Sequence, residues 1–266
     1  MIRTILITGS TDGIGKLTAI KLAKAGHEIY LHGRNQEKLT DSISMVKKES
    51  GNESIQGFVA DLSDLGAVRE LARQVHKKLA KLDVLINNAG VYNSPQATTK
   101  DGLDIRFMVN YIAPYVLTYE LVPLLRKGND ARIVNLSSAA QASVNFDALY
   151  GGKVFSQGDA YAQSKLAITM WSLYQAGQLD DIAVIAVNPG SLLQTKMALE
   201  AFGNFWSPAA KGVDILYDLA TSYRYEEMNG KYFDNDGGNF GTAHPDAYNP
   251  DKIKQLIDST ESMLKG

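Results

Sequence analysis

Short apolar runs alternate with longer amphipathic stretches along most of the chain. The apolar runs are rich in β-branched residues and end at Gly or polar residues, which is typical of buried strands. The stretches between them repeat apolar positions at helical spacing. The expected strands are 2–8, 28–32, 55–60, 83–86, 132–136, 182–187 and 230–233. The expected helices are 15–24, 35–48, 65–79, 103–125, 160–179 and 250–264.

This alternation predicts a single-domain α/β fold over residues 1–266. The near-continuous apolar strands favour a mostly parallel, doubly wound, seven-stranded sheet with helices on both faces. Two stretches depart from the alternation, 139–159 and 191–210. Long irregular segments in a compact domain are often functional, so we expect both to be substrate loops.

Composition narrows the class of protein. With 266 residues, 45% of them hydrophobic, the chain can build a large core. The net charge of −2 gives no electrostatic case for nucleic acid or for an anionic membrane surface. The absence of Cys excludes disulfides and thiolate catalysis and fits a reducing cytosol. The apolar stretches are too short for a signal peptide or a membrane helix, so we expect a soluble cytoplasmic protein without a membrane anchor.

Metal binding is not expected. The histidines show no ligand spacing; they are His27, His32, His76 and His244. A stretch near the C-terminus, Asp234-Asn235-Asp236-Gly237, vaguely suggests a calcium loop. Its ligand pattern is incomplete, so a polar turn is the better interpretation.

A glycine-rich loop, Thr8 to Gly15, lies between the first expected strand and the first expected helix. Backbone N–H groups at a helix start are unpaired and favour a bound anion. Glycines let the chain turn sharply and let a pyrophosphate approach the backbone. A plain strand–helix turn is the alternative, but the strand–loop–helix context favours a phosphate loop.

The glycine spacing, Gly-x-x-x-Gly-x-Gly, resembles the cofactor loop of the short-chain dehydrogenase/reductase family. Further motifs follow in the order found in that family: Asn87-Asn88-Ala89-Gly90, Asn110, Ser138, Tyr161-x-x-x-Lys165 and Asn188-Pro189-Gly190. Motif and context together carry more weight than any one motif. The resemblance implies a Rossmann fold and an oxidoreductase that transfers a hydride between a nicotinamide cofactor and a carbonyl or alcohol.

The resemblance also implies a cofactor site. Its expected residues are Gly9, Ser10, Thr11, Asp12, Gly13, Ile14, Gly15, Arg34, Asp61, Leu62, Asn88, Ala89, Gly90, Tyr161, Lys165, Pro189, Gly190 and Thr195. Strand two ends in Gly33-Arg34-Asn35, with no carboxylate to accept from a ribose 2′-OH. The Arg34 guanidinium suits a 2′-phosphate, so NADP(H) is favoured over NAD(H), although Arg34 can also be read as a solvated surface residue.

Some of these residues have a second interpretation. Asp61 resembles the family's adenine contact, but Asp61, Ser63 or Asp64 can each cap the following helix. The Asn88-Ala89-Gly90 stretch can equally be an ordinary turn at a strand end. The resemblance implies that Pro189 and Gly190 position the carboxamide end of the nicotinamide and that Thr195 assists. Thr195 follows Pro189-Gly190 at a longer interval than is usual in the family.

Tyr161 and Lys165 are four residues apart in an expected helix and therefore share a face. A nearby ammonium favours phenolate and lowers the tyrosine pKa from about 10. Tyr161 can then act as general acid in reduction and general base in oxidation. Ser138 can donate to the substrate oxygen; Ser137 is a rival, but the family's catalytic serine is the second of such a pair. The resemblance implies that Asn110 holds a water molecule that takes part in a proton relay from Lys165.

The substrate pocket should be largely apolar. Its expected residues are Tyr92, Ala139, Ala140, Phe202, Phe205 and Trp206, for which ordinary core packing is the alternative. The Tyr-Ala-Gln-Ser-Lys context, the long loop before it with Gly151 and Gly152, and the late Gly-Lys-Tyr-Phe resemble the retinol-dehydrogenase-like branch. This hints at an apolar carbonyl or alcohol as the small-molecule substrate.

Two questions stay open from the sequence. Many relatives are dimers or tetramers, so analogy alone suggests a homodimer or homotetramer. A non-catalytic NADP(H)-binding sensor or scaffold is the alternative function, although a pure sensor does not need the complete set of Ser138, Tyr161 and Lys165.

Overall fold

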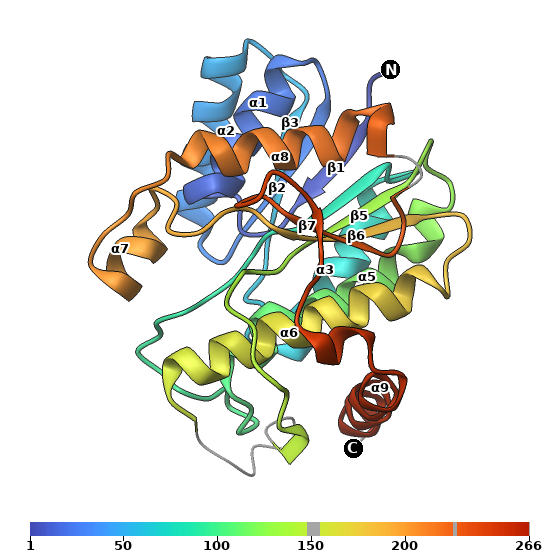
Figure 1. The fold of residues 1–266 in the computed structure, drawn as a ribbon. Coiled ribbons are helices and arrows are strands. Elements are labelled where there is room, and N and C mark those ends of the chain that lie inside the picture. Colours follow the sequence, from blue (N-terminus) through green and yellow to red (C-terminus); the bar gives the residue numbers. More distant parts are fainter. Residues whose placement is uncertain (148–154, 226–227, 266) are drawn as a thin grey trace.

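The computed structural model describes residues 1–147, 155–225 and 228–265. Within these residues, eight strands form one sheet in the order β3-β2-β1-β4-β5-β6-β7-β8 (Figure 1). Neighbouring strands from β3 to β7 pair in parallel, and β8 pairs antiparallel to β7. The strands are β1 Thr4–Ile7, β2 Glu28–Gly33, β3 Ile55–Val59, β4 Val84–Asn87, β5 Arg132–Leu136, β6 Ala183–Asn188, β7 Lys231–Asp234 and β8 Asn239–Gly241. The expected doubly wound α/β fold is confirmed.

Helices cover both faces of the sheet (Figure 1). One face packs against α1 Gly13–Lys24, α2 Gln36–Ser50 and α8 Ala209–Thr221. The other packs against α3 Leu65–Lys78, α5 Ala113–Leu125 and α6 Gln157–Ala176. The remaining elements are α4 Ile105–Phe107, the π-helix η1 Met108–Ile112, α7 Lys196–Phe202, the 3₁₀ turns η3 Tyr223–Tyr225 and η4 Pro245–Tyr248, and α9 Pro250–Lys265.

The strands are apolar on both sides because each side faces a separate core. In β1, Leu6 belongs to the core on the α3–α5–α6 side, while Ile5 and Ile7 belong to the core on the α1–α2–α8 side. In β5, Ile133 and Val134 divide in the same way. Side chains alternate between the two faces of a strand, so a doubly covered sheet needs an unbroken apolar run. This is why the strands were readable from the sequence.

The sheet has eight strands, so the expectation of seven is corrected. β8 has only three residues, contains no β-branched residue and includes Gly241. It is held by pairing with β7, where the rings of Phe233 and Phe240 contact each other at a centroid distance of 5.0 Å. A strand that depends on such a tertiary contact leaves little periodic signal in its own sequence.

The long helix expected over 103–125 is interrupted. It divides into α4, η1 and α5, and the π-helical turn contains Asn110. Pro114 lies four residues after Asn110 and has no N–H to donate to the Asn110 carbonyl, so the regular α-helical bond cannot form there. A proline at this spacing was the available signal for the interruption.

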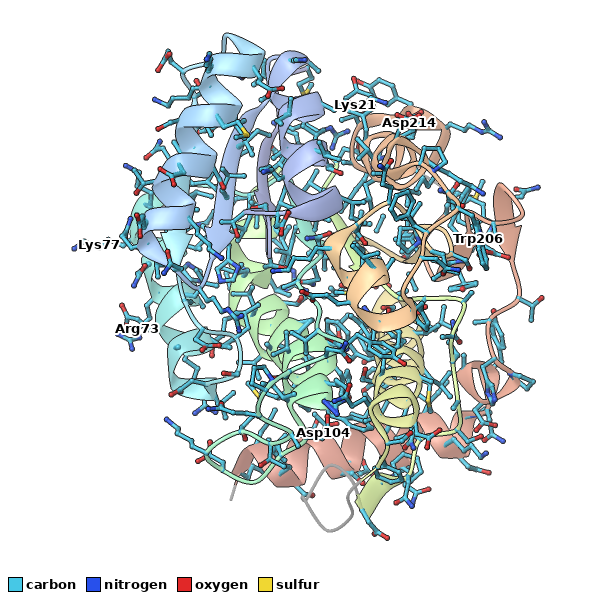
Figure 2. All side chains as sticks on the ribbon, turned by 90° about the vertical axis from the view of Figure 1, so that its left-hand side faces the viewer. Lys21, Arg73, Lys77, Asp104, Trp206 and Asp214 are labelled. Atoms are coloured by element: carbon cyan, nitrogen blue, oxygen red, sulfur yellow. The ribbon has the colours of Figure 1, made fainter. Side chains whose placement is uncertain are left out.

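α7 and α8 lie in and after the stretch that the sequence left without regular structure. α8 packs on α1, and the Lys21 amine lies 2.6 Å from the Asp214 carboxylate, which joins the two helices (Figure 2). The other expected elements are present, with ends shifted by a few residues. Among the described helices, none combines the length and the hydrophobicity that a bilayer-spanning segment requires.

Candidate active site

A cavity of about 730 Å³ opens where β1, β4, β5 and β6 end. The strand order turns back between β1 and β4, and a doubly wound sheet has its binding crevice at such a point. The following expected site residues line the cavity: Gly9, Thr11, Asp12, Gly13, Ile14, Gly15, Arg34, Asp61, Leu62, Asn88, Ala89, Gly90, Tyr92, Ser138, Ala140, Tyr161, Lys165, Pro189, Gly190, Thr195, Phe202 and Trp206. Ser10, Asn110, Ala139 and Phe205 lie outside its lining.

The glycines of the loop after β1 allow close packing against the loop after β4. A Cβ on Gly9, whose φ is +62°, would lie 2.7 Å from the Ala89 Cα. A Cβ on Gly15 would lie 2.3 Å from Asn88 Nδ2. The Asn88 amide in turn donates to the carbonyls of Thr8 at 2.8 Å and Gly9 at 2.9 Å. The two loops therefore form one rigid wall, with the first turn of α1 facing the cavity.

A buried histidine holds the glycine loop from below. The Gly9 N–H donates to His32 Nδ1 at 3.1 Å, so Nε2 carries the ring proton and donates to the Ala60 carbonyl at 3.1 Å. Burial lowers the pKa of His32 to about 4, which keeps the ring neutral. Sequence reasoning gave His32 no role. Its position at the end of β2, facing the glycine loop across the sheet edge, was the signal that could have found it.

Ser10 supports the loop from inside. Its hydroxyl donates to the Ile7 carbonyl at 2.8 Å and accepts from the His32 N–H at 2.9 Å. Ser10 is fully buried. Ser10 and Thr11 are both expected cofactor residues, but only Thr11 lines the cavity.

Arg34 is exposed at the end of β2 and its side chain borders the cavity. Asp61 accepts from the N–H and hydroxyl of Ser63 at 2.9 and 2.8 Å. The N-cap of α3 is Asp64, whose carboxylate accepts from the N–H groups of Gly66 and Ala67. Of Asp61, Ser63 and Asp64, the three candidates for the cap of this helix, Asp64 is the N-cap. Asp61 lines the cavity.

Of the two adjacent serines after β5, Ser138 reaches the tyrosine. The Ser138 hydroxyl lies close enough to the Tyr161 phenol to lower the pKa of that phenol. Ser137 is buried, donates to the Lys165 carbonyl at 3.1 Å and shares a 2.6 Å hydrogen bond with the Thr169 hydroxyl. Ser137 therefore holds α6 against β5, although both serines border the cavity.

Lys165 lies under the tyrosine ring, one helical turn along α6. Its side chain is buried, Nζ donates to the Leu136 carbonyl at 2.7 Å, and Nζ is 5.6 Å from the centroid of the Tyr161 ring. Burial lowers the pKa of Lys165 to about 8. A group with this pKa is still mostly charged at neutral pH.

Burial also raises the pKa of Tyr161, and the neighbouring Tyr92 adds to the rise, while the hydrogen bond with Ser138 opposes it. The expected lowering by the Lys165 ammonium is not the net result. The Lys165 amine is engaged by the Leu136 carbonyl and lies beneath the ring, so desolvation of the phenol is the larger effect. Tyr161 is therefore a protonated phenol at neutral pH.

Asn110 connects the π-helical turn to its neighbours. Its Oδ1 accepts from the Val91 N–H at 2.8 Å, and its Nδ2 donates to the Val91 carbonyl at 3.1 Å and to the Ser164 hydroxyl at 2.9 Å. A Cβ on Gly90 would lie 3.4 Å from Asn110 Oδ1 and 3.6 Å from Lys165 Nζ. The asparagine side chain thus fixes the loop after β4 beside the lysine.

The loop after β6 closes the far side of the cavity. Pro189 and Gly190 line it, and Thr195 caps α7 by accepting from the Ala198 N–H at 3.2 Å. A Cβ on Gly13 would lie 3.9 Å from the Thr195 methyl group, so this loop faces the first turn of α1. No group of three or more His, Asp or Glu side chains among the residues described has an arrangement that could hold a metal ion.

Aromatic rings lead from Tyr161 toward the surface. The Tyr92 ring lies 5.0 Å from the Tyr161 ring and 5.2 Å from the Phe202 ring, between centroids. Phe202 is 53% exposed and Trp206, labelled in Figure 2, is 70% exposed, so neither is core packing. The expected substrate loop 139–159 is described only in part, and Gly151 and Gly152 lie outside the described residues. Met197 and Leu193 also line the cavity and were not singled out from the sequence.

A sequence model of the family described as short chain dehydrogenase matches residues 3–204. The chain belongs to the short chain dehydrogenase family. It is therefore an oxidoreductase by family, as the sequence of motifs indicated. A short chain dehydrogenase from Escherichia coli CFT073, solved in complex with NADPH, has a TM-score of 0.73 and 27% sequence identity, and the match covers 88% of this chain and 96% of that one.

Curated relatives narrow the branch within the short chain dehydrogenases. Retinol dehydrogenase 13 from Mus musculus is 34% identical over 252 residues, which cover 87% of this chain and 75% of the relative. Polyprenol dehydrogenase from Homo sapiens is 35% identical over 198 residues, which cover 71% of this chain and 60% of the relative. The resemblance to the retinol-dehydrogenase-like branch is thereby confirmed.

Proposed function

We propose that this protein is an NADP(H)-dependent oxidoreductase that interconverts a carbonyl and an alcohol on an apolar small molecule, with Tyr161 as general acid and base. One observation carries the proposal: Ser138 and Tyr161 line the same cavity as the glycine loop and Arg34.

The cavity fits a dinucleotide. The glycine loop presents the N-terminal turn of α1, where backbone N–H groups and the helix dipole favour a pyrophosphate. At the end of β2 the wall offers the Arg34 guanidinium and no carboxylate, which favours a 2′-phosphate over a ribose 2′-OH. The NADPH complex of the E. coli relative is consistent with this choice.

When bound, NADPH would supply the hydride for carbonyl reduction. Ser138 donates a hydrogen bond to the substrate oxygen as negative charge develops on it. The Tyr161 phenol, protonated because burial raises its pKa, gives its proton to the same oxygen. With a hydride from the cofactor, the substrate carbon would gain the new C–H bond and its oxygen the Tyr161 proton, and the Tyr161 phenolate would be reprotonated from water. The Lys165 ammonium beneath the ring stabilises that phenolate.

An apolar substrate is favoured by the far end of the cavity. Tyr92, Phe202 and Trp206 provide aromatic surface next to Tyr161, and aromatic walls contribute through buried apolar area. The curated relatives named for retinol and polyprenol are consistent with an apolar alcohol.

The experiment is an NADPH oxidation assay over a panel of apolar aldehydes and ketones, run with wild type and Tyr161→Phe. We expect wild-type turnover, and a loss of about 10²- to 10⁴-fold in kcat in the variant, the usual contribution of a general acid. The NADPH dissociation constant should stay within about twofold, since the ring is kept. Tyr217→Phe, on α8 and outside the cavity lining, is the matched control and should keep full activity.

Two results would contradict this assignment. Retained activity in Tyr161→Phe removes the tyrosine as the proton donor. Tight NADPH binding by wild type, without turnover on any member of the panel, favours the sensor or scaffold instead.

A further inference from the structure

The end of β7 and the turn that follows it form hydrogen bonds with the loop that follows β6. Asp234 ends β7, and Asn235 and Asp236 begin the turn. Together they form the acidic stretch for which we expected a polar turn. The loop after β6, from Asn188 to Leu192, lines the cavity on the side away from the loop after β4. β6 and β7 are neighbours in the sheet, so their ends lie side by side (Figure 1).

Asp236 makes the central contacts. Its Oδ1 accepts from the Ser191 N–H at 2.8 Å, and its Oδ2 accepts from the Ser191 hydroxyl. Oδ2 also accepts from Asn188 Nδ2 at 2.9 Å. The Lys211 amine lies 3.9 Å from Oδ1. One carboxylate therefore holds both ends of the Asn188–Ser191 turn, with a cation beside it.

The two residues before Asp236 tie the same loop through other atoms. Asp234 Oδ1 accepts from Asn188 Nδ2 at 2.9 Å. The Asn235 side chain donates to the carbonyls of Pro189 at 2.8 Å and Lys211 at 2.9 Å, and the Asn235 N–H donates to the Asn188 carbonyl at 3.1 Å. These contacts remain when Asp236 is changed, so its replacement should alter the loop locally and leave the sheet intact.

The loop needs such a hold because part of its backbone is strained. Gly190 has a φ of +122°, and Leu192, a residue with a side chain, has a φ of +45°. Positive φ at a residue such as leucine is uncommon and energetically unfavourable. Such a conformation persists only where surrounding contacts fix it. The Asp236 contacts fall on Ser191, between these two residues.

We propose that Asp236 is a positioning residue of this oxidoreductase: by fixing Ser191 in the Gly190–Leu192 turn, it sets where the nicotinamide end of the cofactor lies relative to Tyr161. This rests on the proposed function and on the expectation that Pro189 and Gly190, which line the cavity, hold the nicotinamide end of the cofactor. The carboxylate acts through the loop and does not itself touch the reacting atoms.

The test compares wild type, Asp236→Asn and Asp236→Ala by calorimetry and kinetics. A hydrogen bond to a charged group contributes about 1.5–3 kcal/mol, so losing one should weaken NADPH binding by about tenfold or more. Misplacement of reacting groups should also lower kcat by about tenfold to 10²-fold. The affinity for 2′,5′-ADP, which has the adenosine and the 2′-phosphate but no nicotinamide, should change by less than about twofold.

Asp130→Asn is the matched control. Asp130 is also a partly exposed carboxylate, and it accepts from Arg3 and Arg132. It precedes β5, so it lies at the N-terminal ends of the strands, whereas the cavity lies at their C-terminal ends. Its loss should lower the thermal midpoint without changing the ratio of NADPH to 2′,5′-ADP affinity. When compared with Asp130→Asn at an equal loss of thermal stability, the Asp236 variants should have a lower ratio of NADPH affinity to 2′,5′-ADP affinity.

The outcomes separate this proposal from the proposed function. Equal weakening of NADPH and 2′,5′-ADP, or no change in either affinity or in kcat, would overturn the positioning role. If wild type binds neither compound, the proposed function itself has failed. If wild type binds NADPH without turnover, the two affinities alone still decide the role of Asp236.

Discussion

Lys165 is the residue whose titration should limit the reaction at high pH. Burial lowers its pKa to about 8, so its positive charge is lost as pH rises through about 8 rather than through 10.5. Burial raises the pKa of Tyr161, so the phenol stays protonated over that range. The charge that stabilises the phenolate therefore disappears first.

We predict that kcat/KM for carbonyl reduction falls about tenfold for each pH unit above roughly 8, as expected for loss of one required proton. Steady-state rates between pH 6 and pH 10 will check this. A profile that stays flat to pH 10 would contradict the assignment. Lys165→Arg keeps its charge at every pH used, so any activity it retains should not show this fall.

Arg34 decides the choice between the two dinucleotides in our proposal. Arg34→Asp replaces the donor fork by an acceptor for a ribose 2′-OH. The ratio of kcat/KM for NADPH to that for NADH should fall by at least about 10²-fold, a difference of roughly 3 kcal/mol, because a favourable ion pair becomes a repulsion. Lys38→Asp, in the first turn of α2, is the control for a simple change of charge. An unchanged ratio in Arg34→Asp would mean that the phosphate is held elsewhere.

Single residues were predictable where chemistry dictated them and less so where packing did. Helix geometry placed Tyr161 and Lys165 on one face, and the family resemblance selected Ser138 over Ser137. Tyr161, Lys165 and Ser138 all line the cavity. The inward direction of Ser10 could not be read, since it depends on bonds to Ile7 and His32 that form only when β1 and β2 are paired. The net pKa of Tyr161 was likewise set by burial, which the sequence does not show.

At the scale of elements, the glycine loop is a packing device as much as an anion site. Its glycines leave room for Asn88 and Ala89 of the next loop. A side chain at Gly15 must displace the Asn88 amide and the Gly9 carbonyl, which lies 2.7 Å from the Cβ position.

We therefore predict that Gly15→Ala lowers the free energy of unfolding by about 1–3 kcal/mol, as overpacking usually does, and weakens NADPH binding. Urea unfolding and calorimetry will measure the two effects. Gly177→Ala is the control, because Gly177 has a φ of −82° and its Cβ would make only ordinary contacts, 3.5 Å from the Tyr174 carbonyl. Equal effects of the two substitutions would show that the loop tolerates a side chain.

Most of the long helices and strands were predicted from the sequence, but α7 and α8 were missed. α8 has buried positions at helical spacing, namely Gly212, Val213, Leu216, Leu219 and Ala220, but Pro208 at its N-cap gives it no side-chain capping bond. α7 is marked by the Thr195 cap and by Gly203 in the left-handed conformation, and these two signals were available in the sequence.

At the scale of the whole molecule, we expect low pH to reduce the free energy of unfolding through protonation of His32. The unfolded chain takes up a proton on this histidine near pH 6.5, whereas the folded protein does so only near pH 4. The resulting stability is fully present above pH 6.5 and is lost as pH falls toward 4. Between pH 7 and pH 5 the loss from this group is about 2 kcal/mol.

Urea unfolding at the two pH values will test this with His32→Gln, whose side chain does not titrate. We expect the variant to lose roughly that 2 kcal/mol of pH dependence. His76→Gln, at an exposed position on α3, should keep it. An unchanged pH dependence in His32→Gln would contradict the role of the buried ring.

The assembly of the site was predictable from the order of strands and motifs. The glycine loop, Asn88-Ala89-Gly90, Ser138 and Pro189-Gly190 each follow a strand. The carboxyl ends of parallel strands lie at one edge of the sheet, so these loops meet although they are far apart in sequence. The aromatic wall was less predictable because its members come from two irregular segments, and nothing in either segment fixes their relative placement. Only the folded chain brings Tyr92 between Tyr161 and Phe202.

The short strand β8 has a consequence for how molecules of this protein meet in concentrated solution. An unpaired sheet border offers backbone groups to which another chain can add, and this is a common route to aggregation. Here β8 runs against β7 and offers only Asn239 to Gly241, with a glycine at its end. So few residues make a poor template, which should discourage border-to-border growth on this side of the sheet.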